Sequence, residues 1–222
     1  MKKSILQIAL VAFITLGAVS CKDNAKESKT SEAKETLAPT AAAVPFTIKN
    51  ANSKIVWTGS KPVGKHTGTI NIQKGIIYVK DATIESGKIN IDMTSITVTD
   101  LDENSGKGSL EAHLKGTVEG KEGDFFNVNK YPSATFEITG VTDKDGTTMM
   151  SGNLTMLDKT HNVTFPVQIT SQDNTVHLKS ETFSIDRTKW GINYGSKSIF
   201  DNLGDKFIND DMEITIDVTA AK

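Results

Sequence analysis

The sequence contains very little cysteine, and Cys21 is the only one in 222 residues. A chain with one cysteine cannot form an internal disulfide, so its folded part must be stabilised by its own hydrophobic core. With four histidines and no cysteine pair, the chain also lacks the usual ligands of a structural zinc site. We therefore expect neither a disulfide nor a metal site.

Aromatic residues are also few, at 6% of the chain, and no stripe of lysine and arginine runs along it. Proteins that bind nucleic acids use such residues to stack on bases and to contact phosphates. The formal net charge is −2, and it becomes −4 if the two lysines within residues 1–20 are removed. Nucleic acid is therefore excluded as an expected partner.

The longest apolar run lies at the N-terminus, from Ile5 to Val19, after Lys2 and Lys3. It is too short for a stable spanning helix and is typical of a secretory signal peptide. The small residues 17–20 lead into Cys21 and resemble a lipobox, although Ala18 replaces the usual leucine. We expect cleavage after residue 20 and acylation of Cys21 with diacylglyceryl and N-acyl chains, which would anchor the protein to a membrane. A free thiol is the alternative.

Residues 22–45 combine small, charged and proline residues. Such a segment cannot bury enough apolar surface to become ordered alone. We therefore expect a signal peptide at 1–20, a lipidated, flexible and disordered tether at 21–45, and a folded domain at 46–222. The expected location is the cell envelope, on the periplasmic side or the surface, with the outer membrane favoured.

From Phe46 onward, apolar residues alternate with polar ones, which predicts strands with one buried face. The clearest examples are residues 163–170 and 212–219, and we expect turns at 86–87, 145–146 and 172–174. About eight short strands of this kind predict an all-β sandwich or a closed barrel. We also expect one short helix over 109–115, capped by Ser109.

The same alternation would also fit a membrane-spanning barrel. Such barrels carry girdles of aromatic residues at both membrane interfaces, and this chain has too few aromatics for them. A lipid anchor would also be redundant. We therefore expect the apolar face to point into the barrel.

Three stretches together resemble the YceI-like family of periplasmic lipid-binding domains. They are His113-Leu114-Lys115 followed by the motif DFFNVNKYPSATF at 124–136, SGNLT at 151–155 leading into the strand at 163–169, and FSIDRTKWGINYGS at 183–196. The resemblance covers nearly all of residues 46–222. It implies an extended antiparallel lipocalin-like barrel of eight strands with one or two short helices. It also implies that the protein carries or sequesters a polyisoprenoid, with an isoprenoid quinone or prenyl lipid as a ligand and no cofactor.

The sequence departs from the family pattern in two places. Residues 116–123 lengthen the link between the His-Leu-Lys stretch and the motif at 124–136, and the turn at 157–160 lacks a glycine often found there. Because the link is longer, the loop beside the barrel mouth can differ in shape from that of the family. The choice of ligand can differ with it.

An eight-stranded barrel has room either for packed side chains or for one slender ligand. Composition alone favours a filled barrel, whereas the resemblance favours a hollow one. Phe125 and Phe126 would form either a lid at the entrance or a plug at one end. The residues expected to line the cavity are Ile89, Ile91, Met93, Phe125, Phe126, Phe136, Ile138, Leu154, Met156, Phe165, Val167, Ile214 and Ile216.

Two other functions stay open beside lipid binding. A filled barrel would be a structural or interaction protein, and the oligomeric state is open, with a homodimer as one option. An enzyme acting on an amphiphile would need Asp186 and a histidine as acid and base, but the histidines show no catalytic spacing. Asp186 and Arg187 fit an ion pair or a turn contact better, and we expect Trp190 to pack and Gly191 to supply an unusual backbone angle. We therefore expect a binding protein and not an enzyme. The histidines are His66, His113, His161 and His177.

Overall fold

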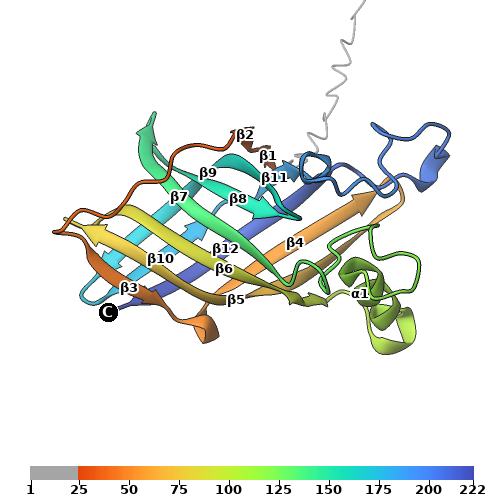
Figure 1. The fold of residues 1–222 in the computed structure, drawn as a ribbon, viewed down its shortest axis with the longest axis horizontal. Coiled ribbons are helices and arrows are strands. Elements are labelled where there is room, and N and C mark those ends of the chain that lie inside the picture. The colour runs from red at the N-terminus through yellow and green to blue at the C-terminus, as the bar shows by residue number, and fades with distance from the viewer. Residues whose placement is uncertain (1–24) are drawn as a thin grey trace, which may run out of the picture.

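The computed structural model describes residues 25–222, so the expected signal peptide and Cys21 lie outside the described residues. The described chain forms a ring of antiparallel strands in the order β4-β5-β6-β7-β8-β9-β10-β12, which closes where β12 pairs with β4 (Figure 1). This arrangement confirms the expected eight-stranded, lipocalin-like barrel.

The ring strands are β4 (Lys54–Lys61), β5 (Gly64–Lys80), β6 (Thr83–Val98), β7 (Ser133–Lys144), β8 (Thr147–Met156), β9 (Lys159–Gln172), β10 (Thr175–Ser180) and β12 (Asp211–Ala221). Four shorter strands join the same sheet: β1 (Lys26–Glu27), β2 (Lys29–Glu32), β3 (Val44–Ile48) and β11 (Phe183–Asp186). Short 3-10 turns occur at η1 (Asn50–Asn52), η2 (Glu103–Ser105), η3 (Arg187–Trp190) and η4 (Gly204–Lys206). The alternating segments of the sequence thus fall within β9 and β12, as predicted.

The helix α1 (Lys107–Lys115) lies between β6 and β7 at one end of the barrel (Figure 1). The expected cap at Ser109 is wrong, because the helix already begins at Lys107 and Ser109 lies inside it. The chain turns into the helix through Gly106, whose φ of 92° is left-handed, and the Asp102 carboxylate caps the preceding η2 turn. The helix itself therefore has no side-chain cap, and the capping carboxylate nearby belongs to the η2 turn.

Two of the three expected turns are confirmed, at Asp145-Gly146 and around Asp173. The expected turn at 86–87 is wrong, because both residues lie inside β6 and the chain reverses at Asp81 and Ala82 instead. The glycine at 87 is needed for packing, since a Cβ there would lie 2.9 Å from the Ile76 carbonyl oxygen. A glycine required by a close contact between strands was thus misread as a turn signal.

The expectation of a disordered tether fails over residues 26–32. β1 pairs in parallel with β11, and β2 pairs antiparallel with residues 161–164 of β9. Between β1 and β2, Ser28 is buried and its backbone N–H donates to the Ser184 carbonyl at 2.9 Å. β9 pairs with β10 only from Val167 onward, so residues 159–166 of β9 have backbone groups that β10 does not pair. Polar residues can pair with these groups because only backbone hydrogen bonds are needed.

After β2 the chain crosses the outside of the barrel before it enters β3 (Figure 1). We call residues 26–43 the N-terminal strap. Its course is fixed at Lys34, which bonds the Asn153 side chain, and at Thr40, which bonds the Glu85 carboxylate. Strands of the sheet thus also lie on the N-terminal side of the expected domain at 46–222, because β3 starts at Val44 and the strap supplies β1 and β2.

Candidate functional site

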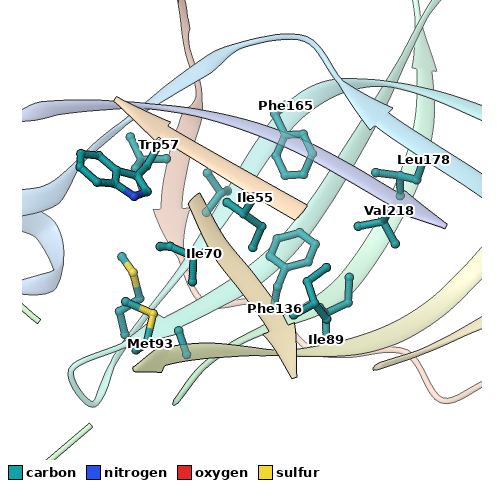
Figure 2. Packing of buried hydrophobic residues seen from close by; sticks show 14 of the residues in the cluster. Ile55, Trp57, Ile70, Ile89, Met93, Phe136, Phe165, Leu178 and Val218 are labelled. Carbon is teal, nitrogen blue, oxygen red and sulfur yellow. The ribbon is translucent and has the colours of Figure 1, made fainter. Parts of the chain in front are cut away.

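The barrel interior is packed at one end and hollow at the other. Figure 2 shows Phe136 and Phe165 between the two parts, with Ile89, Leu178 and Val218 on the packed side and Trp57 on the other. The hollow part is a cavity of about 440 Å³. This volume lies in the range of about 300–1,000 Å³ that is typical of small-molecule sites.

The cavity walls are almost entirely apolar. Besides residues expected from the sequence, they include Ile55, Trp57, Ile70, Ile96, Leu110, Leu114, Ala134, Val163, Phe183, Ile185, Ile208 and Met212. Leu154 and Ile216 point inward yet remain partly accessible, because the space beside them is not filled by other side chains. The walls can therefore bury an apolar ligand but offer it few hydrogen bonds.

Most of the expected lining residues line this cavity, and three do not. Ile89, Ile138 and Val167 are buried in the core, outside the cavity wall, because they lie deeper along the barrel axis. The expected residues that do line the cavity are Ile91, Met93, Phe125, Phe126, Phe136, Leu154, Met156, Phe165, Ile214 and Ile216. Whether any of them contacts a ligand remains a prediction.

The largest lining residue that we did not expect is Trp57. It stands opposite Gly68 across the β4–β5 ladder, and a Cβ on Gly68 would lie 2.6 Å from the Trp57 ring. The glycine therefore leaves room for the indole to lie flat against the wall. The alternation of Ile55 and Trp57 in the sequence is a signal that could have identified this strand face.

Three phenylalanine rings form the floor of the cavity. The Phe165 and Phe183 rings are stacked with centroids 4.3 Å apart, and the Phe136 ring lies 5.8 Å from that of Phe165. Gly152 stands behind Phe136, where a Cβ would approach the Phe136 ring to 2.2 Å. The position of the floor therefore depends on a glycine in the neighbouring strand.

Phe125 and Phe126 lie in the loop that follows α1, and both are buried against the cavity. The Phe125 ring makes edge contacts with His113 and a tilted contact with Tyr194, with centroids 5.1 and 5.4 Å away. His113 is held in turn by the Asp124 carboxylate, with Nε2 and Oδ2 2.7 Å apart. The segment that follows α1 thus contributes to a small aromatic cluster that closes one side of the cavity.

The cavity opens beneath the hairpin that joins β4 and β5. Residues 61–65 at the tip of this hairpin are all exposed, and Lys61, Val63 and Lys65 also line the cavity. On the facing side, the Asn209 backbone N–H donates to the Ser60 carbonyl at 2.9 Å. The polar groups of the site are thus concentrated at its mouth.

The Arg187 side chain is 1% exposed and holds the loop at 191–210. Its guanidinium donates to the carbonyl oxygens of Asn209, Ile192 and Ile208 at 3.1, 2.7 and 3.1 Å. Burial lowers the pKa of Arg187, while the nearby Asp210 carboxylate opposes that shift. Arg187 therefore stabilises the chain segment that borders the mouth by bonding several of its carbonyl groups.

The neighbouring residues have structural contacts of the kind expected. The Asp186 carboxylate caps η3 by accepting hydrogen bonds from the Thr188 N–H and hydroxyl, so Asp186 makes a turn contact. The ion-pair partner of Arg187 is instead Asp210, at 3.7 Å. Trp190 is fully buried and its indole N–H donates to the Leu154 carbonyl, and Gly191 has a φ of 86°.

The structure does not bring Asp186 together with a histidine. Each histidine has another partner: the Asp100, Asp124 and Asp217 carboxylates for His66, His113 and His177, and the Lys189 carbonyl for His161. Within residues 25–222, no group of three or more metal-binding side chains is arranged to hold an ion. In the same part of the chain, no helix is long and apolar enough to cross a membrane.

Comparisons with known proteins agree with this architecture. The model of the YceI-like domain matches residues 46–220. The solved structure of BcnA from Burkholderia cenocepacia is 20% identical, with a TM-score of 0.58 over 78% of this chain and 99% of that one. A polyisoprenoid binding domain from Saccharophagus degradans is 10% identical, with a TM-score of 0.54 over 79% of this chain and 97% of that one. A search of curated proteins found no match. The chain belongs to the YceI-like domain family.

Proposed function

We propose that this protein is an envelope lipoprotein that binds, carries or sequesters a polyisoprenoid or a similar amphiphilic lipid. The observation that carries the proposal is the hollow, apolar half of the barrel, whose polar groups lie only near the mouth. The similar structure from Saccharophagus degradans is a polyisoprenoid binding domain, which supports the same class of ligand.

The energetics favour an apolar chain as the ligand. Burial is worth about 0.8 kcal/mol per CH₂ group, so a five-carbon isoprene unit contributes roughly 3–4 kcal/mol before ordering costs. The chain would extend toward Phe136 and Phe165, and a polar head would remain near Lys61 and Lys65. Binding is then passive, and the proposal includes no catalytic step.

The proposed anchor is Cys21, which precedes the first described strand by five residues. Acyl chains on Cys21 would hold the protein at the membrane from which it takes or to which it delivers lipid. Intact mass measurement of the envelope-purified protein tests the anchor. We expect loss of residues 1–20 and a mass increase that matches acylation. A Cys21→Ser variant should show no such increase.

Lipid binding is tested by native mass spectrometry of the same purified protein, followed by organic extraction of bound molecules. We expect a non-covalent adduct that extraction identifies as a prenyl lipid. A protein that is bare after purification, and still bare after incubation with quinones and prenyl alcohols, would overturn the proposed function.

A further inference from the structure

Three large apolar side chains are exposed around the cavity mouth. Val63 at the tip of the β4–β5 hairpin is 81% exposed, and Ile199 and Phe200 in the loop at 191–210 are 50% and 49% exposed. We call these three residues the apolar rim. Figure 1 shows the hairpin, the loop and α1 at the same end of the barrel.

Hydrogen bonds hold the two segments that carry the rim. The Asn209 side-chain amide donates to the Ser60 hydroxyl at 2.8 Å, and the Phe200 N–H donates to the Ser196 carbonyl at 2.9 Å. Exposed apolar residues at the mouth of a cavity are typical of a surface that contacts an apolar partner.

The charges of the hairpin indicate the kind of partner. Its tip contains Lys61 and Lys65 beside the exposed Val63, and it contains no acidic residue. Basic residues beside an apolar side chain suit a bilayer with anionic headgroups, because the lysines contact phosphates while the apolar side chain enters the acyl region.

The position of the first described residues points in the same direction. Ala25 precedes β1, which pairs with β11, and β11 continues through η3 into the loop that carries Ile199 and Phe200. The five residues from Cys21 to Lys26 can span at most about 18 Å. An acyl anchor at Cys21 would therefore hold the start of β11, on the strand that leads toward this loop, close to the bilayer.

We propose that the apolar rim docks onto an anionic lipid bilayer, so that the cavity mouth faces the membrane and a lipid enters without crossing water. This inference rests on the proposed lipid-binding function and names the surface that serves it. It makes the hairpin and the loop at 191–210 the contact site of the protein with its lipid source.

Insertion of the rim can be measured on the full chain with a polarity-sensitive fluorophore. A Val63→Cys variant would be labelled and mixed with vesicles of phosphatidylethanolamine and phosphatidylglycerol. The matched control is Asp145→Cys at the β7–β8 turn, and the labelled unaltered chain gives any contribution from Cys21. We expect a blue-shifted emission, quenched by bromine-labelled lipid, at position 63 only. Equal signals from positions 63 and 145 would overturn docking by the rim.

The role of the rim in lipid exchange is tested with the double variant Ile199→Ser, Phe200→Ser, neither of which lines the cavity. Leu37→Ser is the control, because Leu37 is an equally exposed apolar residue on the N-terminal strap. We expect the double variant to transfer a fluorescent prenyl alcohol between vesicles about tenfold more slowly, with unchanged uptake from detergent micelles. Normal uptake with normal transfer would overturn the docking surface alone. Failure of the unaltered protein to take up the probe would overturn the proposed function itself.

Discussion

The side-chain amide of Asn153 forms two hydrogen bonds with the backbone of Lys34, a residue 119 positions away in the sequence. Asn153 Nδ2 donates to the Lys34 carbonyl at 2.6 Å, and Asn153 Oδ1 accepts from the Lys34 N–H at 3.0 Å. Asn153 is buried in β8 and also accepts from Asn162 Nδ2. One amide in the barrel wall therefore fixes the place at which the N-terminal strap crosses it.

We expect Asn153→Ala to release the strap while the barrel remains folded. The two lost hydrogen bonds correspond to about 1–3 kcal/mol of local stability, and Asn162 keeps a second partner in Thr139. Hydrogen exchange measured by mass spectrometry should become faster over residues 29–36. Asn174→Ala, in the exposed β9–β10 turn, is the control, and unchanged protection of the strap in Asn153→Ala would contradict this account.

Arg187→Met should destabilise the protein strongly. The substitution leaves one buried and two partly buried carbonyl oxygens without their donor, and it leaves the Asp210 carboxylate without its cation. We expect a loss of about 3–5 kcal/mol in the free energy of unfolding, measured in urea. Lys179→Ala, at an exposed position of β10, should change it by less than about 0.5 kcal/mol. Comparable effects of the two substitutions would show that Arg187 does not hold the loop.

Gly152→Ala should disturb the floor of the cavity. Its Cβ would lie 2.2 Å from Phe136 Cζ, so the ring must move, and overpacking of this kind costs about 1–3 kcal/mol. We expect lower thermal stability together with weaker uptake of a prenyl lipid. Gly140→Ala in the preceding strand is a matched control, because a Cβ there meets nothing within 4 Å. Equal uptake by the two variants would argue against this role of Phe136.

Ile214→Phe should separate stability from lipid capacity. Ile214 is partly accessible and lines the cavity, so a larger side chain can occupy empty space. We expect the free energy of unfolding of the lipid-free protein to stay level or to rise by up to about 1 kcal/mol, while uptake falls. Glu213→Gln, the adjacent position on β12, should leave both unchanged. Uptake that is unaffected by Ile214→Phe would place the ligand elsewhere.

Stability should also depend on Asp211. Burial raises the pKa of this carboxyl, and the negative charges of Glu27, Asp186 and Asp210 raise it further. The folded protein thus binds the Asp211 proton more tightly than the unfolded chain does, so stability is lost as pH rises through that pKa. We expect Asp211→Asn to be more stable than the unaltered protein at pH 7, by less than about 1 kcal/mol, because the burial of this carboxyl is only partial and solvent screens the charges around it.

Urea unfolding at several pH values checks this prediction. The advantage of Asp211→Asn should shrink with falling pH and vanish below about pH 3.5, where both the folded and the unfolded carboxyl are protonated. Asp205→Asn, in an exposed 3-10 turn, serves as the control. An advantage of Asp211→Asn that persists or grows in acid would contradict the assigned direction.

The fold could be predicted largely because alternation shows which face of a strand is buried. It does not show how deep a residue lies along the barrel. Ile89 and Ile214 follow the same period-two pattern, yet Ile89 packs in the core and Ile214 lines the cavity. Which part of the interior stays empty depends on how large side chains such as Phe136 and Phe165 meet across the barrel, and the sequence of one strand does not contain that information.

The N-terminal strap could not be predicted for a different reason. Its residues have no apolar periodicity, and their order arises from backbone hydrogen bonds to edges of β9 and β11 that exist only in the folded barrel. The conformation of the β8–β9 turn also depends on the folded barrel. Leu157 and Asp158 adopt φ values of 48° and 62° without glycine, because the paired strands on either side impose that geometry.

The packed half of the barrel has a consequence for ligand choice. Because the rings of Phe136, Phe165 and Phe183 close the cavity from below, the tube has a fixed depth. A linear chain that reaches those rings can be buried completely only up to a certain number of carbons, and every further unit must protrude into the surroundings of the mouth. The three phenylalanines would therefore set the greatest chain length that the cavity can bury. Affinity should rise with chain length up to that limit and then level off.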